Sequence, residues 1–499
     1  MKTIKIYFLS GLLLFAAFSC SDDFLTVKTT GSLTSADAEA ALKADPTKLE
    51  SFVNAIYSLM VQFDLVSESH DAFGLMSILH STDMMGEDIV QSKFHWFGYD
   101  YEHDNHEMTY RRTLTDWTYL YSIISNANIV INMTSDNTEQ FKPFRGQAFA
   151  LRGMAYYYLI QLYQHTYNFQ ISKNLPGIPM YYALNEGKAN INGRATVEQV
   201  YTQIEADLTK GIELLEGWDR GNKNQIDYYV ANGLLARFYL LSEQWEKAND
   251  AATKALEPYE IMSKEDLHDG FMNINNKEWM WGFDHTAETS TVYASFFSHM
   301  SNIAPGYAGL NYAPRHIDRR LFDQIPLTDE RRKLFQDEDT MTITADELTS
   351  SNMESTSATA WKLPYANVKF GWDGNWTMDY PYMRAAEMVL IQAEALAEMG
   401  LTSEAASKLS VLMVNRDPAW NKTDVTPEEV YLQRRIELWG EGFSFFDLKR
   451  LNKGIDRTYA GTNHPANGQI KVAAKAKTWI YQIPQSEMQE NTAIKENNE

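Results

Sequence analysis

Apolar residues recur every three to four positions over most of the chain, and this spacing constrains its fold more than any other feature. Side chains so spaced share one face of an α-helix, whereas a half-buried strand alternates apolar and polar residues. Few segments alternate here. We therefore expect a mostly helical protein, with helices near residues 47–63, 71–85, 106–132, 140–167, 196–216, 226–242, 245–257, 379–399, 402–415, 427–439 and 443–451.

Three of these segments share a second pattern. Ala155, Ala236 and Ala393 occupy matching places in them. A large residue follows three positions later in each, namely Tyr158, Tyr239 and Leu396. Small residues let antiparallel helices approach closely while a large residue fills the adjoining gap, which is the packing of tetratricopeptide hairpins. The alanines are 81 and 157 residues apart, far from a period of about 34, so long insertions must separate the hairpins.

The longest insertion extends from about residue 258 to residue 378. Helical periodicity lapses there, and prolines, glycines, asparagines and serines are frequent, which indicates loops and short strands. Aromatic residues are dense within and beside it: residues 361–382 contain seven in 22, and residues 279–312 contain eight in 34. A further cluster, FHWFGYDYEHDN, occupies residues 94–105. Aromatic residues thus concentrate outside the helical hairpins.

The N-terminus has the order of a signal peptide. Lys2 and Lys5 precede a twelve-residue apolar run, which is followed by Ser19 and Cys20. Spanning a membrane takes about 20 apolar residues, so a permanent membrane helix is disfavoured. Cys20 is the only cysteine in the chain, and its position resembles the lipobox of bacterial lipoproteins. We expect cleavage after residue 19 and lipidation of Cys20, which would anchor a soluble body to a membrane.

Charge and cysteine content exclude several classes of function. The chain carries 44 Lys and Arg against 66 Asp and Glu, a formal net charge of −22, without a dense basic stripe. Phosphate backbones are bound chiefly by clustered Lys and Arg, so we expect no nucleic-acid partner. A single cysteine leaves no intramolecular disulfide, cysteine-rich zinc site or iron–sulfur cluster.

Several motifs, in a fixed order, match one known family. They are FRGQAFALRGMAYYYLIQLY (144–163), LPGIPMYY (175–182), YTQIEADLTKGIELL (201–215), NGLLARFYLLSEQWEKA (232–248), YMRAAEMVLIQAEALAEMG (382–400), RRIELWGEGFSFFDLKR (434–450) and WIYQIPQSEMQENTAIKENN (479–498). Together with the lipobox they resemble the SusD/RagB family of nutrient-binding outer-membrane lipoproteins of Bacteroidetes. One departure is Ser444, where the family commonly carries Arg or another large residue.

This resemblance implies a fold and a function. The fold would be an α-superhelix of about four tetratricopeptide-like hairpins with an irregular loop-rich lobe, a SusD-like domain over residues 20–499 whose ligand-binding insertion lies at about 258–378. The protein would be anchored in the outer membrane, exposed at the cell surface, and would deliver oligosaccharide or polysaccharide to a SusC-like TonB-dependent transporter. Two alternatives are a peptide-capturing member of the family and a structural lid subunit without its own ligand site.

Sugars present apolar C–H faces and polar rims, so glycan sites combine flat aromatic side chains with polar hydrogen-bond partners. In residues 94–105, Asp100, Asp104 and Asn105 are interleaved with the aromatics. By positional analogy with glycan-binding members of the family, we expect ligand contacts from Trp96, Tyr99, Tyr101, Trp279, Trp281, Tyr293, Tyr307, Trp372 and Trp376. For any one of these aromatics, burial in a core is the more frequent outcome.

Catalytic and metal-binding interpretations have little support in the sequence. His103 and His106 are three residues apart, but no HExxH pattern or third ligand accompanies them. Nucleophile-elbow, P-loop and Rossmann patterns are missing. The loop DGNWTMD (373–379) could hold calcium, yet it lacks the regular ligand spacing of an EF-hand. We expect a binding protein that is not an enzyme and has no cofactor.

Overall fold

A computed structural model describes residues 48–63, 65–133, 139–182, 192–339, 341–342, 344–346 and 357–499, together with residues 42 and 45. Residues 1–19 and Cys20 lie outside this set, so signal cleavage and lipidation stay predictions. The described residues from 48 onward belong to one compact unit. Among the described helices, none is both long enough and apolar enough to cross a bilayer.

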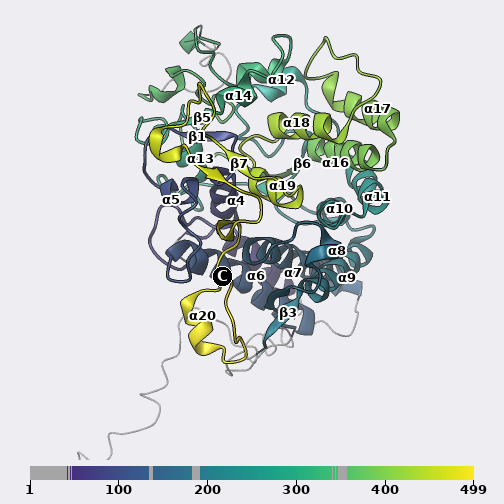
Figure 1. Cartoon of the computed structure of the whole chain (residues 1–499). Helices are drawn as coiled ribbons and strands as arrows, with labels where there is room; N and C mark the ends of the chain where they lie inside the picture. The colour runs from purple at the N-terminus through teal and green to yellow at the C-terminus, as the bar shows by residue number, and fades with distance from the viewer. Residues whose placement is uncertain are drawn as a thin grey trace, which may run out of the picture. The chain divides into compact units, whose positions relative to one another are not determined.

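Eight helices pack in series along one side of this unit. Each contacts its successor, with α18 packing on α16, so that residues far apart in the chain form a continuous stack. In Figure 1 the stack extends from α6 and α7 in the lower half to α16 and α17 at the upper right. The helices are α6 (Arg111–Met133), α7 (Lys142–Tyr163), α9 (Val197–Leu215), α10 (Tyr228–Leu241), α11 (Trp245–Leu256), α16 (Ala385–Glu398), α17 (Thr402–Met413) and α18 (Pro427–Glu437).

Small residues bring these helices together, as the sequence pattern predicts. Ala155, Ala236 and Ala393 are completely buried. Between α7 and α9 the approach is closer still, since a Cβ atom at Gly146 would lie 2.8 Å from the Cγ atom of Leu215. Any larger residue at position 146 would push the two helices apart. The predicted mostly helical, tetratricopeptide-like architecture is confirmed.

Local side-chain chemistry fixes where several helices begin. Thr196 and Thr426 form capping boxes, in which the hydroxyl accepts a hydrogen bond from the backbone N–H three residues on. The side chains at those positions, Gln199 and Glu429, accept the N–H of the capping threonine in return. These reciprocal bonds satisfy backbone donors that a helix start leaves unpaired. The helix starts predicted near 196 and 427 therefore have a direct physical cause.

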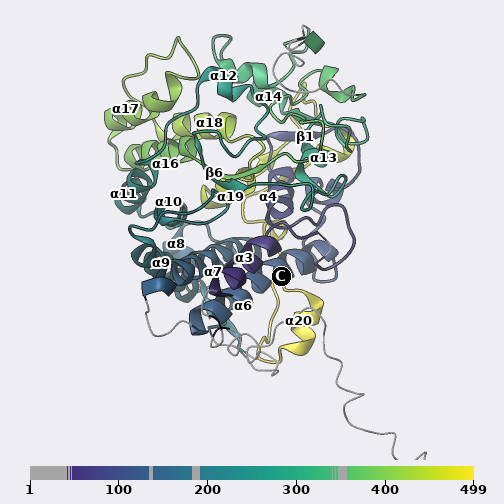
Figure 2. The ribbon, with the colours of Figure 1, turned by 180° about the vertical axis from the view of Figure 1, so that it is seen from behind.

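The other side of the unit is built from short elements (Figure 2). Antiparallel pairs join β1 (Ile89–Gln91) to β5 (Arg315–Ile317) and β4 (Trp279–Phe283) to β6 (Tyr380–Arg384). The helices here include α4 (Leu75–Met84), α5 (Gly98–Tyr101), α12 (Lys264–Leu267), α13 (Phe296–Met300) and α14 (Arg319–Phe322). The insertion predicted at 258–378 thus consists, over its described residues, of loops, short strands and helices of three to five residues.

The remaining elements lie at the start of the unit, between the helices of the stack and in the last sixty residues. They are α3 (Leu49–Leu59), α8 (Phe169–Ser172), β2 (Pro176–Pro179), β3 (Arg194–Thr196), α19 (Ser444–Arg450), β7 (Ile455–Asp456), β8 (Lys471–Val472) and α20 (Gln485–Glu490). Strand β2 pairs with β3 and β7 with β8, both antiparallel. The C-terminal segment returns to the stack, where the backbone N–H of Tyr481 donates to the carbonyl of Leu162 in α7.

A buried ionic network joins the stack to the short elements. Glu437 at the end of α18 lies 3.0 Å from Arg416, 3.3 Å from Arg384 and 3.4 Å from Arg331. Arg384 also pairs with Glu278, next to β4. Burial alone would raise the pKa of Glu437, but the three guanidinium groups hold it well below the usual range. Glu437, in the late motif at residues 434–450, therefore lies in the core of the protein.

Ser444 departs from the family pattern, and the structure gives a reason for its size. A Cβ atom at Gly86 would lie 2.0 Å from the Ser444 hydroxyl oxygen, so α19 begins against a glycine that follows α4. Asp83 of α4 accepts hydrogen bonds from the backbone N–H groups of Gly442 and Ser444 at 2.7 and 3.0 Å. A carboxylate placed at these donors stabilises the start of a helix. The small side chain of Ser444 thus fits the close contact between the start of α19 and Gly86.

Candidate functional site

A large cavity lies where α5 and the loop after it meet the start of α6. Its volume is about 880 Å³, within the range of about 300 to 1,000 Å³ that is usual for small-ligand sites. The insertion contributes Tyr307 to the same cavity. The lining residues are Asp71, Phe94, His95, Trp96, Phe97, Tyr99, Asp100, Asp104, Asn105, Thr109, Tyr110, Arg111, Arg112 and Tyr307.

An aromatic cluster centred on His70, called the aromatic wall below, reaches one side of this cavity through Trp96 and Tyr307, whereas His70 itself does not line the cavity. The His70 Nδ1 atom lies 2.6 Å from the Tyr307 phenolic oxygen. The ring centroid of His70 is 5.7 Å from that of Trp96 and 6.1 Å from that of Tyr293, whose plane is nearly parallel. Tyr293 in turn lies 5.5 Å from Tyr307. Three predicted ligand-binding aromatics from distant parts of the chain therefore pack around one imidazole ring, and two of them, Trp96 and Tyr307, line the cavity.

A second aromatic pair stands at the cavity rim. The rings of Phe94 and Tyr99 meet edge to face at 5.2 Å, yet these residues remain 50 % and 60 % exposed. The backbone between them is shaped for this contact, since a Cβ atom at Gly98 would lie 2.6 Å from the Phe94 ring. Exposed aromatic faces beside a large cavity are the arrangement that a ligand with apolar faces can cover.

The floor of the cavity is charged and tightly paired. Arg111 donates from both terminal nitrogens to the two carboxylate oxygens of Asp71, at 2.7 and 2.8 Å. Arg112 donates to Asp100 at 2.9 Å and to Asp71 at 3.2 Å. Burial alone would raise the pKa of Asp71, but Arg112 and Arg111 hold it below the usual value. The floor is therefore a rigid ionic lattice.

Asp116 lies behind this floor without a hydrogen-bond partner among the described residues for either carboxylate oxygen. Its nearest cation is Arg112, at 3.7 Å. Burial raises the pKa of Asp116 to about 7, and the neighbouring Asp100 and Asp71 carboxylates act in the same direction, against Arg112. Protonation of Asp116 is therefore coupled to the ionic lattice of the cavity floor.

Three of the expected ligand contacts lie in the core. Tyr101 is buried at the far side of α5, where its hydroxyl bonds to His464 and Arg457 covers its ring. Trp279 and Trp281 on β4 are each 1 % exposed. The indole nitrogen of Trp281 donates to the carbonyl of Asn224 at 2.9 Å. Both faces of β4 are covered, so neither tryptophan presents a face to a ligand in this conformation, and we leave all three aromatics out of the candidate site.

Trp372 and Trp376 form a separate pair, with ring centroids 4.5 Å apart. Trp372 is buried and Trp376 is half-buried, and neither lines the large cavity. The Ser290 hydroxyl donates to the backbone carbonyl of Trp376, which ties this loop to the segment that carries Tyr293. The loop that carries the two tryptophans is therefore hydrogen-bonded to the segment next to Tyr293, but both tryptophans lie outside the cavity.

Sequence reasoning missed several residues of the site. His70 lies in no aromatic cluster, and its role becomes visible only where the chain brings it between Trp96, Tyr293 and Tyr307. Arg111 is the first residue of α6 and Thr109 lies just before it, in a segment where the sequence predicted only a helix. The only available signal was their proximity in sequence to the cluster at residues 94–105.

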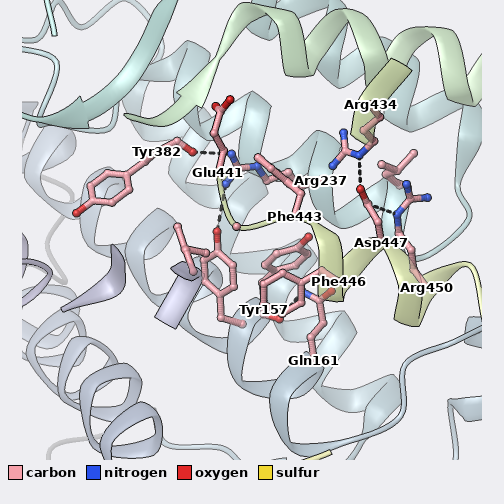
Figure 3. A pocket seen from close by; sticks show the side chains of 14 residues that line it. Tyr157, Gln161, Arg237, Tyr382, Arg434, Glu441, Phe443, Phe446, Asp447 and Arg450 are labelled. Atoms are coloured by element: carbon pink, nitrogen blue, oxygen red, sulfur yellow. Dashed lines mark hydrogen bonds and ion pairs between the residues drawn. The ribbon is translucent and has the colours of Figure 1, made fainter. Parts of the chain in front are cut away.

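A second cavity, shown in Figure 3, lies between α7, α10 and the segment from α18 to α19. Its volume of about 20 Å³ accommodates about one water molecule. The Phe443 ring lies between the guanidinium groups of Arg237 and Arg434, at 5.2 and 4.9 Å. Asp447 binds Arg434 and Arg450 at 2.7 and 2.8 Å. The other charged groups of this cavity are paired with residues outside it, Arg237 with Glu387 and Glu441 with Arg384. The cavity is therefore a structural junction.

The sequence offered two candidates for metal binding, the histidines at positions 103 and 106 and the loop at residues 373–379. In the part of the chain that the structure describes, no group of three or more His, Cys, Asp or Glu side chains could hold a metal ion. His103 is buried, with its Nε2 atom 2.6 Å from the carbonyl oxygen of Met85, and burial lowers its pKa to about 3. The loop at 373–379 is organised by Asp373, whose carboxylate accepts the N–H groups of Asn375, Trp376 and Thr377.

Two stretches of the chain match known sequence families. Residues 35–240 match a SusD-like family described as starch-binding associating with outer membrane, and residues 366–499 match the SusD family. Together the matches cover more than half of the chain. No curated protein gives a significant match.

Solved structures with the same fold cover nearly the whole chain. A SusD-like carbohydrate binding protein from Bacteroides vulgatus shares 25 % identity with a TM-score of 0.74, over 90 % of this chain and 97 % of that one. A putative sugar binding protein from the same species has 23 % identity and a TM-score of 0.72, over 91 % and 98 %. Surface glycan-binding protein A from Bacteroides thetaiotaomicron, solved with laminarihexaose, has 16 % identity and a TM-score of 0.67, over 91 % and 99 %.

Proposed function

Because the chain belongs to the SusD family, we propose that it captures an oligosaccharide or polysaccharide at the cell surface and delivers it to a SusC-like TonB-dependent transporter. The observation that carries this proposal is the open cavity of about 880 Å³ with Trp96, Tyr99 and Tyr307 along its sides. Sugar rings stack their C–H faces on such aromatic faces and direct their hydroxyl groups to polar neighbours.

The names of the structural neighbours support a glycan as the ligand. One is described as a carbohydrate binding protein and another was solved with a bound laminarihexaose. The polar groups of this cavity suit hydroxyl groups, since Asp104, Thr109 and Tyr110 line it and are exposed. Aromatic faces and exposed polar groups thus occur together in one place.

The proposed function is binding without a chemical step. A glycosidase needs one carboxyl group that can donate a proton and a second that acts as base or nucleophile. Here Asp71 and Asp100 accept hydrogen bonds from Arg111 and Arg112, and the guanidinium groups favour the ionised form of Asp71. The lattice therefore suits a fixed floor for a ligand better than an acid and base pair.

Anchoring and delivery depend on residues outside the described set. We propose that Cys20 carries the lipid that holds the protein at the outer membrane. Metabolic labelling with a fatty acid would test this proposal: the intact protein should incorporate label, and a Cys20→Ala variant should not. Labelling of both proteins, or of neither, would contradict lipidation at Cys20. Co-purification with a TonB-dependent transporter from outer membranes would test the partner.

Ligand binding is tested by affinity electrophoresis against a panel of polysaccharides, followed by isothermal titration with the glycan that retards the protein. We expect Trp96→Ala to weaken binding at least about tenfold, since one aromatic face is lost. Tyr182→Ala is the matched control, because Tyr182 is an exposed aromatic residue that does not line the cavity. Saturable binding of peptides with no glycan bound would favour the peptide-capturing alternative. Unchanged uptake after replacement of all cavity aromatics would favour the structural lid.

A further inference from the structure

The charges around the large cavity do not balance. Among the lining residues, Asp71, Asp100 and Asp104 are acidic, whereas Arg111 and Arg112 are basic. No lysine lines the cavity. His95 contributes no positive charge near neutral pH, since burial and the nearby Arg315 lower its pKa. The lining therefore carries one more formal negative than positive charge.

Both arginines are already committed to carboxylates of the protein. The two terminal nitrogens of Arg111 bind Asp71 in a two-pronged pair. Arg112 is buried, and its three nitrogens donate to Asp100, to the Asp71 carboxylate and to the Asp71 backbone carbonyl. A ligand carboxylate would have to displace one of these pairs, and would leave an aspartate buried without its partner.

Asp104 is different from the other two acids because it is exposed. Among the described residues, no lysine or arginine forms an ion pair with it, and its contact is with the Tyr110 hydroxyl at 3.4 Å. The field of this carboxylate reaches its neighbour, since Asp104 is the main cause of a raised pKa for Tyr110. Lys93, just before the aromatic cluster in sequence, donates instead to the backbone and side-chain oxygens of Asn311.

We infer that the cavity selects uncharged glycans over glycans that contain uronic acids, and that Asp104 is the residue that sets this preference. The inference rests on the proposed function, and it names the class of glycan. The Asp104 carboxylate would accept two hydroxyl hydrogen bonds from an uncharged sugar, and hydrogen bonds to an ionised acceptor are the stronger kind. A uronate at the same position brings a second negative charge and no hydroxyl donor at its carboxylate.

The physical effect is a difference between two ligands at one carboxylate. Like charges within a few ångströms repel, and the repulsion is larger in a partly enclosed site than in bulk water. The paired arginines cannot offset it, because their charge is already neutralised by Asp71 and Asp100. Specificity of this kind comes from the disfavoured ligand as much as from the favoured one.

The experiment uses a matched pair of ligands. The uncharged glycan that binds most tightly in the panel is compared by titration with the same glycan after oxidation of its primary hydroxyl groups to carboxylates. For the wild-type protein we expect the oxidised glycan to bind at least about tenfold more weakly, about 1.4 kcal/mol. Asp104→Asn should bind the parent glycan somewhat more weakly, yet it should reduce the ratio between the two ligands to about threefold or less.

The control variant is Asp250→Asn, which removes the same charge from the exposed surface of α11, away from the cavity. It should leave the ratio unchanged. High salt screens the repulsion, so it should reduce the ratio between the affinities for the parent and the oxidised glycan in the wild-type protein. It should have little effect on this ratio in Asp104→Asn. A wild-type protein that prefers the oxidised glycan, or a ratio that Asp104→Asn does not change, overturns the inference while the proposed function stands. Failure to bind any glycan overturns both.

Discussion

The Nδ1 atom of His70 lies 2.6 Å from the phenolic oxygen of Tyr307, a residue 237 positions later in the chain. The backbone carbonyl of His70 is in turn 2.7 Å from the Nε2 atom of His299. Trp96 and Tyr293 pack around the same imidazole ring. Two hydrogen bonds of His70 thus link the early segment of the chain to the insertion. They hold the aromatic wall in a fixed orientation, which lowers the cost of ordering side chains when a ligand binds.

Tyr307→Phe tests whether the hydrogen bond to His70 contributes to ligand binding separately from the aromatic ring of Tyr307. The substitution keeps the aromatic face and removes the hydroxyl that bonds to His70. It should lower the free energy of unfolding by about 1 kcal/mol, the usual value of one hydrogen bond, and weaken glycan binding a few fold. Chemical denaturation and titration measure the two effects. Tyr312→Phe is the control, since Tyr312 is an exposed tyrosine beside Tyr307. Equal effects of the two variants would contradict this role for the His70 bond.

Replacing an exposed aromatic residue should affect glycan binding, whereas replacing a buried one should affect stability. Tyr99→Ala removes a side chain from an exposed residue at the rim of the cavity. We expect weaker glycan binding with an unchanged free energy of unfolding. Trp279→Ala removes a buried indole from β4, and should lower the free energy of unfolding by about 3 to 5 kcal/mol. Its folded fraction should bind glycan normally. A Trp279 variant that stays stable but loses binding would place the ligand near β4 and contradict our assignment.

The helical part of the fold could be predicted from sequence because its causes are local. Apolar spacing placed the helices, and caps such as Thr196 and Thr426 fixed their starts. The exception is residues 380–384, which we expected to begin a helix and which form strand β6. Pairing with β4 decides this segment, and that partner lies about a hundred residues away in the chain. The spacing of apolar residues within a segment carries no information about such a distant strand.

Titration of Asp116 should make stability depend on pH near neutrality. Burial raises its pKa to about 7 in the folded protein, whereas the unfolded chain has an ordinary value of about 3.8. The folded state therefore holds a proton that the unfolded state has lost, and stability falls as the pH rises from about 4 to 7. Relative to Asp116→Asn, the wild-type protein should lose up to about 1.4 kcal/mol per pH unit across this window. Chemical denaturation at a series of pH values measures this loss. A difference in the free energy of unfolding between the two proteins that is the same from pH 4 to pH 8 would contradict this effect.

The ionic network at Glu437 should respond to acid in the opposite direction. Its pKa is held below the usual 4.5, so its stabilisation is complete above that value and is lost as the pH falls below it. Glu437→Gln leaves Arg331, Arg384 and Arg416 short of a buried partner. We expect a loss of about 3 to 5 kcal/mol in the free energy of unfolding. Glu246→Gln on the exposed surface of α11 is the control, with less than about 0.5 kcal/mol expected. Equal losses for the two variants would contradict the structural role of the network.

The candidate site was harder to derive from sequence than the helices, because aromatic density does not distinguish a wall from a core. Trp96 and Tyr99 were expected from their cluster and line the cavity. Tyr101 belongs to the same cluster, yet its ring turns inward on the one-turn helix α5 and packs against Arg457. His70 had no local signal at all, and only its contacts across the fold bring it to the site.

The most direct test of the central claim is a crystal structure of the protein with the glycan that binds most tightly. We expect a sugar ring within van der Waals distance of the Trp96 and Tyr307 rings, and a hydroxyl group within hydrogen-bond distance of Asp104. Glycan density at Trp372 and Trp376, or elsewhere on the surface with the large cavity empty, would contradict the account.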